Sequence, residues 1–105
     1  MRVQIESPYE SGSEGARNYL ARALRDSLYR GESPFASHGL YTLALDDDDP
    51  EQRELGIKAG FEYMLSADKV AVYYDRGFSA GMVDGINYAI AVGKPIEYRS
   101  LYDRY

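Results

Sequence analysis

The hydrophobic positions of the chain follow two alternating periods. Near the start, Val3 and Ile5 lie on one side of residues 1–6 and polar residues lie on the other, which predicts a strand. Residues 14–30 repeat apolar side chains every four positions, which predicts a helix with one buried stripe. Gly31 follows as a natural end of that helix.

The rest of the chain continues this alternation. We expect a short strand at 35–37, a helix at 50–66, a central strand at 70–74, a helix between Ser79 and Gly93, and a last strand at 95–98. Asp49 caps the helix that begins at Pro50, and Ser79 caps the next one. Residues 38–45 fit either an extended connection or a helical turn.

This order of elements predicts the fold class. Strands that alternate with helices of this length make right-handed crossovers and a parallel sheet. We therefore predict an α/β three-layer sandwich with a small parallel sheet of about four strands, flavodoxin-like or Rossmann-like. The 105 residues are expected to form a single domain, 1–105.

Composition narrows the chemistry. The chain has no cysteine and one histidine, which excludes thiol catalysis and a multi-histidine metal site within one chain. Its net charge of -5 argues against binding a nucleic acid polymer. Residues 1–6 read as a strand rather than a signal peptide, and no apolar run approaches the roughly 20 residues that span a bilayer. We expect a cytoplasmic protein with no cofactor, no metal and no membrane contact.

Polar loops are predicted where three of the strands end. Ligands of open parallel sheets bind outside the carboxyl ends of the strands, and helix N-termini there favour an anion. The loops therefore either bind a phosphate or a ribose, or only cap helices. The candidate ligand-binding residues are Ser7, Pro8, Tyr9, Ser11, Gly12, Ser37, His38, Asp75, Arg76, Phe78, Ser79, Gly81 and Met82.

Other features allow two interpretations. His38 is either structural or part of the site, since its unperturbed pKa lies near neutrality. Acidic residues 46–49 either bind a divalent cation or complement the dipole of the next helix, and we favour the helix dipole. Among the 11 tyrosines, Tyr98, Tyr102 and Tyr105 either pack internally or form a subunit contact. Exposed edges of a small sheet predict at least a homodimer.

Several blocks of the chain, in order, resemble nucleoside 2-deoxyribosyltransferases and their small phage and bacterial relatives. The blocks are Ser7-Pro8-Tyr9, 47–56, 67–75, 79–82, Tyr88-Ala89 and 93–96. The resemblance implies a flavodoxin-like fold and a site for a nucleoside or nucleotide. It also implies that Tyr9 matches the family's supporting tyrosine and Asp75 a loop aspartate. The position of the family's nucleophilic glutamate falls at Gly85, beside Asp84.

Three functional hypotheses remain open. The first is a protein that binds a nucleotide or nucleoside derivative without turnover, for example a phage-encoded protein in the host cytoplasm that sequesters a nucleotide signal. The second is an N-glycosidase or deoxyribosyltransferase with Asp84 or Asp75 as the catalytic carboxylate and Tyr9 or His38 assisting. The third is a non-catalytic structural module whose loops cap helices.

Overall fold

Four parallel strands form the sheet of the computed structural model, which describes residues 1–9 and 13–102. The predicted α/β fold class is confirmed. The elements, in chain order, are β1 (Arg2–Glu6), α1 (Glu14–Tyr29), β2 (Ser33–Phe35), α2 (Ser37–Tyr41), α3 (Pro50–Ser66), β3 (Lys69–Tyr73), α4 (Ala80–Ala91) and β4 (Ile96–Arg99).

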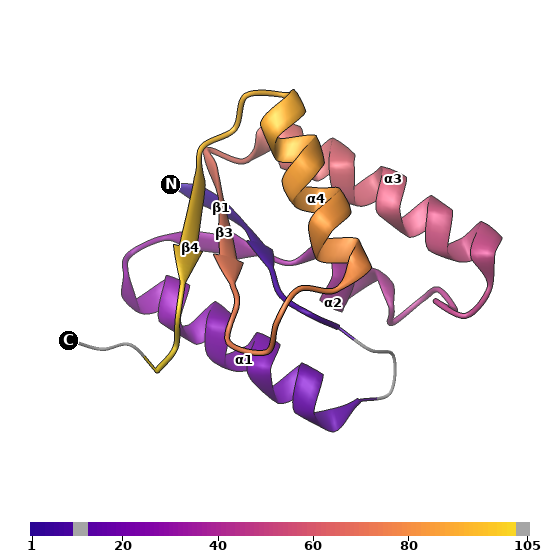
Figure 1. Ribbon diagram of the computed structural model, residues 1–105, viewed down its shortest axis with the longest axis horizontal. Helices are drawn as coiled ribbons and strands as arrows, with labels where there is room; N and C mark the ends of the chain where they lie inside the picture. Colours follow the sequence, from indigo (N-terminus) through magenta and orange to yellow (C-terminus); the bar gives the residue numbers. More distant parts are fainter. Residues whose placement is uncertain (10–12, 103–105) are drawn as a thin grey trace.

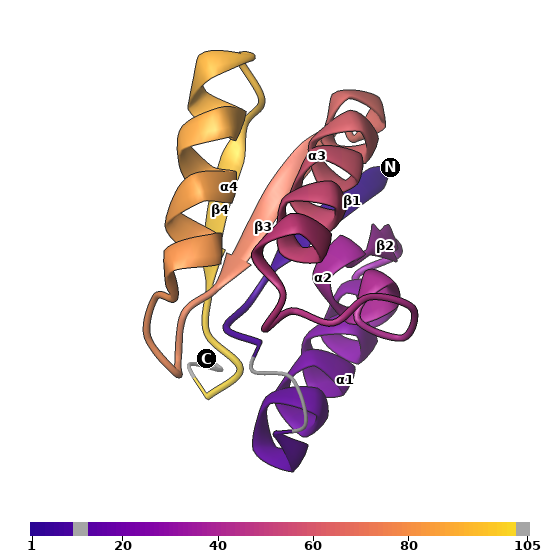
Figure 2. The same cartoon turned by 90° about the vertical axis from the view of Figure 1, so that its right-hand side faces the viewer.

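The helices lie in two layers on either side of the sheet. Helix α1 covers one face, and α3 and α4 lie next to each other on the opposite face (Figures 1 and 2). The strand order is β2-β1-β3-β4, so the chain first adds β2 on one side of β1 and then adds β3 and β4 on the other. This change of direction creates a topological switch point between β1 and β3, the place where open α/β sheets bind ligands.

The central strands are buried on both faces. Val3 and Ile5 pack toward the α1 face with Tyr19 and Leu20, as the alternation of β1 predicts. Val70 and Val72 pack toward α3 and α4 with Met64 and Met82. The other side of β1 presents Gln4 and Glu6, and both are buried too, at 2% and 8% exposure. The polar side of β1 therefore faces the α3 and α4 layer and not solvent.

Local sequence explains where the elements begin. The side chains of Ser13, Asp49 and Ser79 accept hydrogen bonds from the first turns of α1, α3 and α4, and Pro50 takes the first position of α3. Strand β2 spans residues 33–35, whereas 35–37 was expected, because an edge strand tolerates Pro34. The ambiguous segment after it begins with the short helix α2.

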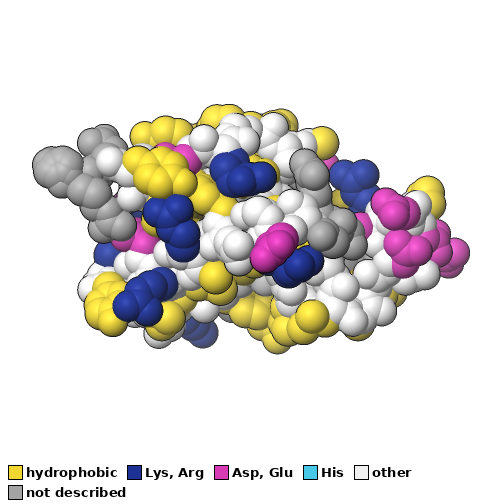
Figure 3. Space-filling model, turned by 90° about the horizontal axis from the view of Figure 1, so that it is seen from below, with side chains coloured by type: hydrophobic (Ala, Val, Ile, Leu, Met, Phe, Trp, Pro, Cys, Tyr) yellow, Lys and Arg dark blue, Asp and Glu magenta, His cyan; other side chains and the backbone are white. Residues whose placement is uncertain are grey.

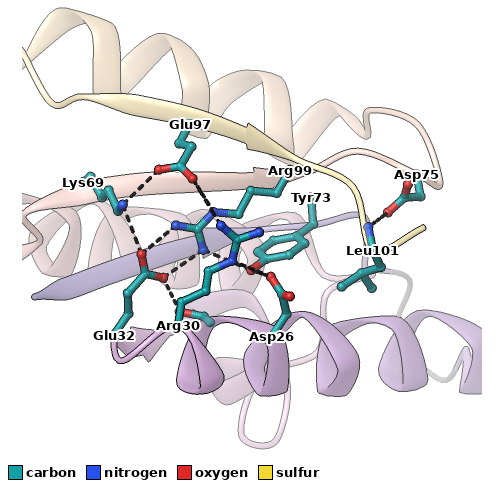
Figure 4. Close-up of polar contacts among 10 residues, drawn as sticks. Asp26, Arg30, Glu32, Lys69, Tyr73, Asp75, Glu97, Arg99 and Leu101 are labelled. Carbon is teal, nitrogen blue, oxygen red and sulfur yellow. Dashed lines mark hydrogen bonds and ion pairs between the residues drawn. The ribbon is translucent and has the colours of Figure 1, made fainter. Parts of the chain in front are cut away.

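A buried ion-pair network joins β4 to the α1 side of the sheet (Figure 4). Arg99 is 3% exposed and donates two hydrogen bonds to Glu32, of 2.8 and 2.7 Å. It also donates to Glu97 at 3.0 Å and to the Tyr73 hydroxyl at 3.0 Å. Lys69 pairs with both glutamates, at 3.0 and 2.9 Å. These contacts provide the partners that a buried guanidinium requires.

No helix in the part of the chain that the structure describes is long and apolar enough to cross a membrane. The edge strand β4 carries exposed Tyr98, and Tyr102 follows it with 63% exposure. Tyr105 lies outside the described residues.

Candidate functional site

A cavity of about 180 Å³ lies over the carboxyl end of β1, between the sheet and helices α2, α3 and α4. It sits beside the switch point between β1 and β3. Its lining residues are Gln4, Glu6, Ser7, Tyr9, Ser37, His38, Tyr41, Thr42, Leu45, Asp47, Arg53, Gly56, Ile57, Gly60, Phe61, Met64, Ser79, Ala80, Gly81, Met82 and Gly85.

Glu6 is the buried acid of this cavity. Burial raises the pKa of its carboxyl from an ordinary 4.5 to about 8, and a hydrogen bond with Gln4 lowers that pKa only in part. Across residues 1–9 and 13–102 no basic group forms an ion pair with Glu6. A carboxyl that loses its water without gaining a cation keeps its proton. Glu6 is therefore neutral at pH 7 and can donate a hydrogen bond.

Helix α4 has a glycine, Gly85, at the place where the Glu6 carboxyl packs against it. A Cβ atom built on Gly85 would lie only 2.6 Å from Oε2 of Glu6. Any other residue at position 85 would therefore require the Glu6 carboxyl to move. The carboxyl of the site is carried by β1, at the place where α4 has no side chain.

Ser7, Tyr9 and His38 form a second polar group in the cavity. The Ser7 hydroxyl and Nε2 of His38 are 3.0 Å apart, with the donor set by the histidine tautomer. The edge of the Tyr9 ring meets the His38 ring at 5.5 Å between centroids. Burial lowers the pKa of His38 from 6.5 to about 4, so the imidazole is neutral at pH 7.

Small residues keep the two covering helices close to the cavity. Gly56 and Gly60 face it from α3, and Gly81 and Gly85 face it from α4. Each pair is four positions apart and so shares one side of its helix. A Cβ on Gly60 would lie 2.7 Å from Oγ of Ser37, a hydroxyl that accepts a 3.1 Å hydrogen bond from Gln4.

Two charged side chains from the α2–α3 region, the half-buried Asp47 and the exposed Arg53, line the cavity and also border a neighbouring pocket. Acidic side chains gather at the end of the molecule where the α2–α3 connection lies (Figure 3). In that connection Asp49 caps α3 by accepting from Glu51, and Asp46 accepts from Asp48. Within residues 1–9 and 13–102, no cluster of three or more acidic or histidine side chains could hold a metal ion.

The structure brings most of the sequence-predicted ligand residues to the cavity. Those that line it are Ser7, Tyr9, Ser37, His38, Ser79, Gly81 and Met82. Pro8, Arg76 and Phe78 do not line it, and the rings of Phe78 and Tyr98 meet on the surface, 6.4 Å apart. Ser11 and Gly12 lie outside the described residues.

Neither aspartate of the enzyme hypothesis reaches the cavity. Asp84 is exposed on α4, because the side of the helix that faces the cavity belongs to its neighbour Gly85. Asp75 accepts hydrogen bonds from the Tyr19 hydroxyl at 2.6 Å, from the Leu101 backbone N–H at 2.8 Å and from the Ser100 hydroxyl. Figure 4 shows the bond to Leu101, which joins the residues directly after β4 to the loop after β3.

The sequence interpretation missed Glu6. Its alternation with Ile5 by itself predicts only a strand. The available signal was that both faces of a strand inside a parallel sheet are covered by helices, so a polar residue there is buried. A buried glutamate at the carboxyl end of such a strand is a candidate site residue.

Comparisons with known proteins give a family and a fold. The family model described as a domain of unknown function, DUF7768, matches residues 1–99. No curated protein matches the sequence. A solved 2-deoxyribosyltransferase from the psychrotolerant bacterium Bacillus psychrosaccharolyticus, characterised for the synthesis of nucleosides, has a TM-score of 0.72 and 19% identity. The match covers 100% of this chain and 76% of that chain, and it shows that the fold is shared.

Proposed function

The chain belongs to the DUF7768 family, and we propose that it binds a nucleoside or a nucleotide derivative in the cavity over β1. The observation that carries this proposal is the place of the cavity. It lies at the carboxyl end of β1, beside the switch point of a fold shared with a nucleoside-handling transferase. That is where a flavodoxin-like sheet binds its ligand.

The lining suits a ligand with a flat ring and a polar sugar. Tyr9, Tyr41 and Phe61 provide aromatic surface, and Ser7 and Ser37 provide hydroxyl groups. The first residues of α4 also line the cavity, and backbone N–H groups of a first helical turn favour a phosphate or an oxygen-rich group.

The size of the cavity limits how much of the ligand enters. A volume of 180 Å³ lies below the range of about 300–1,000 Å³ that holds a whole drug-sized ligand. We therefore propose that a base or a sugar enters and that the rest of the ligand lies at the mouth. The exposed Arg53, which also lines the cavity, would meet a phosphate there.

Cleavage of an N-glycosidic bond is the second candidate function, and Glu6 favours it. Such cleavage needs an acid or a carboxylate at the reacting bond, and Glu6 provides a carboxyl inside the cavity. Binding without turnover, as by a phage-encoded protein that sequesters a nucleotide signal, requires no such group. Whether the bound molecule stays intact or is cleaved distinguishes binding without turnover from cleavage.

Thermal shift tests the binding proposal. The probes are nucleosides, nucleoside monophosphates, cyclic dinucleotides and ADP-ribose. A ligand present at 100 times its Kd stabilises the protein by about 2.7 kcal/mol. We expect at least one class to raise the Tm of the wild type and the shift to be reduced in Tyr9→Ala. Tyr29→Ala, which removes a 78%-exposed ring from α1, is the matched control. The proposal is contradicted if no class of compound shifts the Tm. It is also contradicted if Tyr9→Ala shows the same shift as the wild type.

We also propose that the protein is a homodimer or a higher homo-oligomer. Strand β4 has β3 as its neighbour on one side, and exposed Tyr98 and Tyr102 lie along and after it. Pairing through such an edge covers its unpaired backbone groups. Light scattering after size-exclusion chromatography tests this, and the mass of one chain contradicts it.

A further inference from the structure

The cavity lining contains two carboxyl groups among the described residues, the buried Glu6 and the half-buried Asp47. Glu6 is the last residue of β1, and its carboxyl lies against Gly85 of α4. A ligand part that enters the cavity therefore meets this carboxyl. The geometry gives Glu6 direct access to a bound ring and gives no such access to the exposed Asp84.

We propose that Glu6 is the general acid of the site and donates its carboxyl proton to the base of a bound nucleoside as the N-glycosidic bond breaks. This inference rests on the proposed function, since it requires a nucleoside or a nucleotide in the cavity. It assigns the chemistry to a residue of β1, and not to a residue of α4 or of the loop after β3.

The reaction balances with water as the only co-reactant. The bond between C1′ and the base nitrogen breaks, and its electron pair stays with the base. The Glu6 proton neutralises the base, which leaves as a free base while Glu6 becomes a carboxylate. A water oxygen then bonds to C1′, and a proton of that water returns to Glu6. One carboxyl performs both steps because it starts in the protonated form.

Burial prepares Glu6 for this role. The pKa of its carboxyl is raised to about 8 because burial disfavours the charged form, so the carboxyl is protonated at neutral pH. A general acid works best when its pKa lies near the operating pH. The matching change in rate is a loss of activity as the pH rises past about 8.

The other titratable groups near Glu6 come from elements other than α4. Helix α4 presents no titratable side chain to the cavity, and His38 from α2 is neutral because burial lowers its pKa to about 4. The titratable groups that share the lining with Glu6 are Tyr9 after β1, His38 and Tyr41 of α2, Asp47 before α3 and Arg53 of α3.

The experiment measures free base released from each compound that raises the Tm of the wild type. Glu6→Gln keeps the shape and the hydrogen-bonding ability of a neutral carboxyl but has no proton to transfer. We expect its release rate to fall by at least about 100-fold, the usual minimum contribution of a general acid, while the thermal shift by the ligand persists. Glu62→Gln, a change of the same kind at an exposed position of α3, should release base at the wild-type rate.

Three results would overturn the assignment. The first is base release by Glu6→Gln at the wild-type rate. The second is that Asp84→Asn loses base release while Glu6→Gln keeps it. The third is a wild type that binds a nucleoside but leaves it intact. In each of them binding still stands, so the proposed function survives. If no compound shifts the Tm, the proposed function itself fails. The pH profile of wild-type release needs no variant and gives an independent check should Glu6→Gln fold poorly.

Discussion

Oε2 of Glu6 lies 2.6 Å from the position that a Cβ atom of Gly85 would occupy. The carboxyl at the end of β1 and a side chain at this position of α4 therefore exclude each other. The two residues are distant in the sequence but act as one unit of packing. Their relationship determines how the inner end of the cavity is built.

The first prediction is that Gly85→Ala destabilises the protein. The new methyl group must displace a buried carboxyl, and overpacking of this kind costs about 1–3 kcal/mol. Gly81→Ala on the same helix is the control, because the nearest atom to its Cβ would be 3.9 Å away. That control should gain up to about 1 kcal/mol from a better helix former. Urea denaturation measures both.

A double substitution identifies the cause of that loss. If the clash with Glu6 is responsible, Glu6→Ala should offset part of the cost of Gly85→Ala, with a coupling energy of about 0.5–3 kcal/mol. Simple additivity of the two free-energy changes would show that the carboxyl does not occupy this space.

The second prediction concerns stability against pH. Burial raises the pKa of Glu6 to about 8. Between pH 6.5 and 8 the folded chain holds this proton and the unfolded chain has lost it, so the free energy of unfolding falls as pH rises. The slope is at most about 1.4 kcal/mol per pH unit. Below pH 6.5 His38 acts in the opposite direction, because burial lowers its pKa to about 4 and acid then favours the unfolded chain.

Glu6→Gln should remove the slope between pH 6.5 and 8, and Glu62→Gln should keep it. Urea denaturation at half-unit pH steps gives the comparison. A wild-type free energy that is flat over this window would mean that Glu6 is already ionised in the folded protein.

The third prediction addresses the network around Arg99. Glu32 accepts two hydrogen bonds from this buried guanidinium, and they lower the pKa of Glu32 to about 2. Glu32→Ala leaves a buried charge with Glu97 as its remaining acid and should cost about 3 kcal/mol. Glu54→Ala, which breaks an exposed pair with Lys58, should cost about 0.5 kcal/mol or less. Equal losses in thermal or urea unfolding would argue against a buried network.

The fourth prediction assigns Asp75 to stability. Its carboxylate accepts from Tyr19, from the Leu101 backbone and from Ser100. Asp75→Asn places an amide where acceptors are needed and should cost about 2 kcal/mol. Faster hydrogen exchange at the Leu101 amide should accompany the loss. An unchanged exchange rate would show that this bond does not hold Leu101 in place.

The fold was predictable because local signals agreed with each other. Val3 and Ile5 marked a strand, Ser79 capped a helix as expected, and the run 70–74 had the apolar character of a central strand. The second strand was misplaced by two residues, since Pro34 looked like a limit although an edge strand accepts it.

The site was only partly predictable, because loops and strand ends carry different signals. Ser7, His38 and Ser79 stood out as polar residues in loops, and the structure gathers them at one cavity. Asp75 followed a strand in the same way, but its bonds hold it to Tyr19 and Leu101 on the α1 side. Glu6 was missed because its burial follows from the fold class, in which helices cover both faces of β1, and not from the local pattern of residues 1–6.

The glycine pairs of α3 and α4 are sequence positions that determine the shape of the cavity. Gly56, Gly60, Gly81 and Gly85 each remove a side chain from its lining. In another DUF7768 chain, an alanine or a larger residue at the positions that match Gly60 and Gly85 would require the facing Ser37 or Glu6 side chain to move or to be replaced. Comparing these positions across the family would show which members keep this arrangement of the lining.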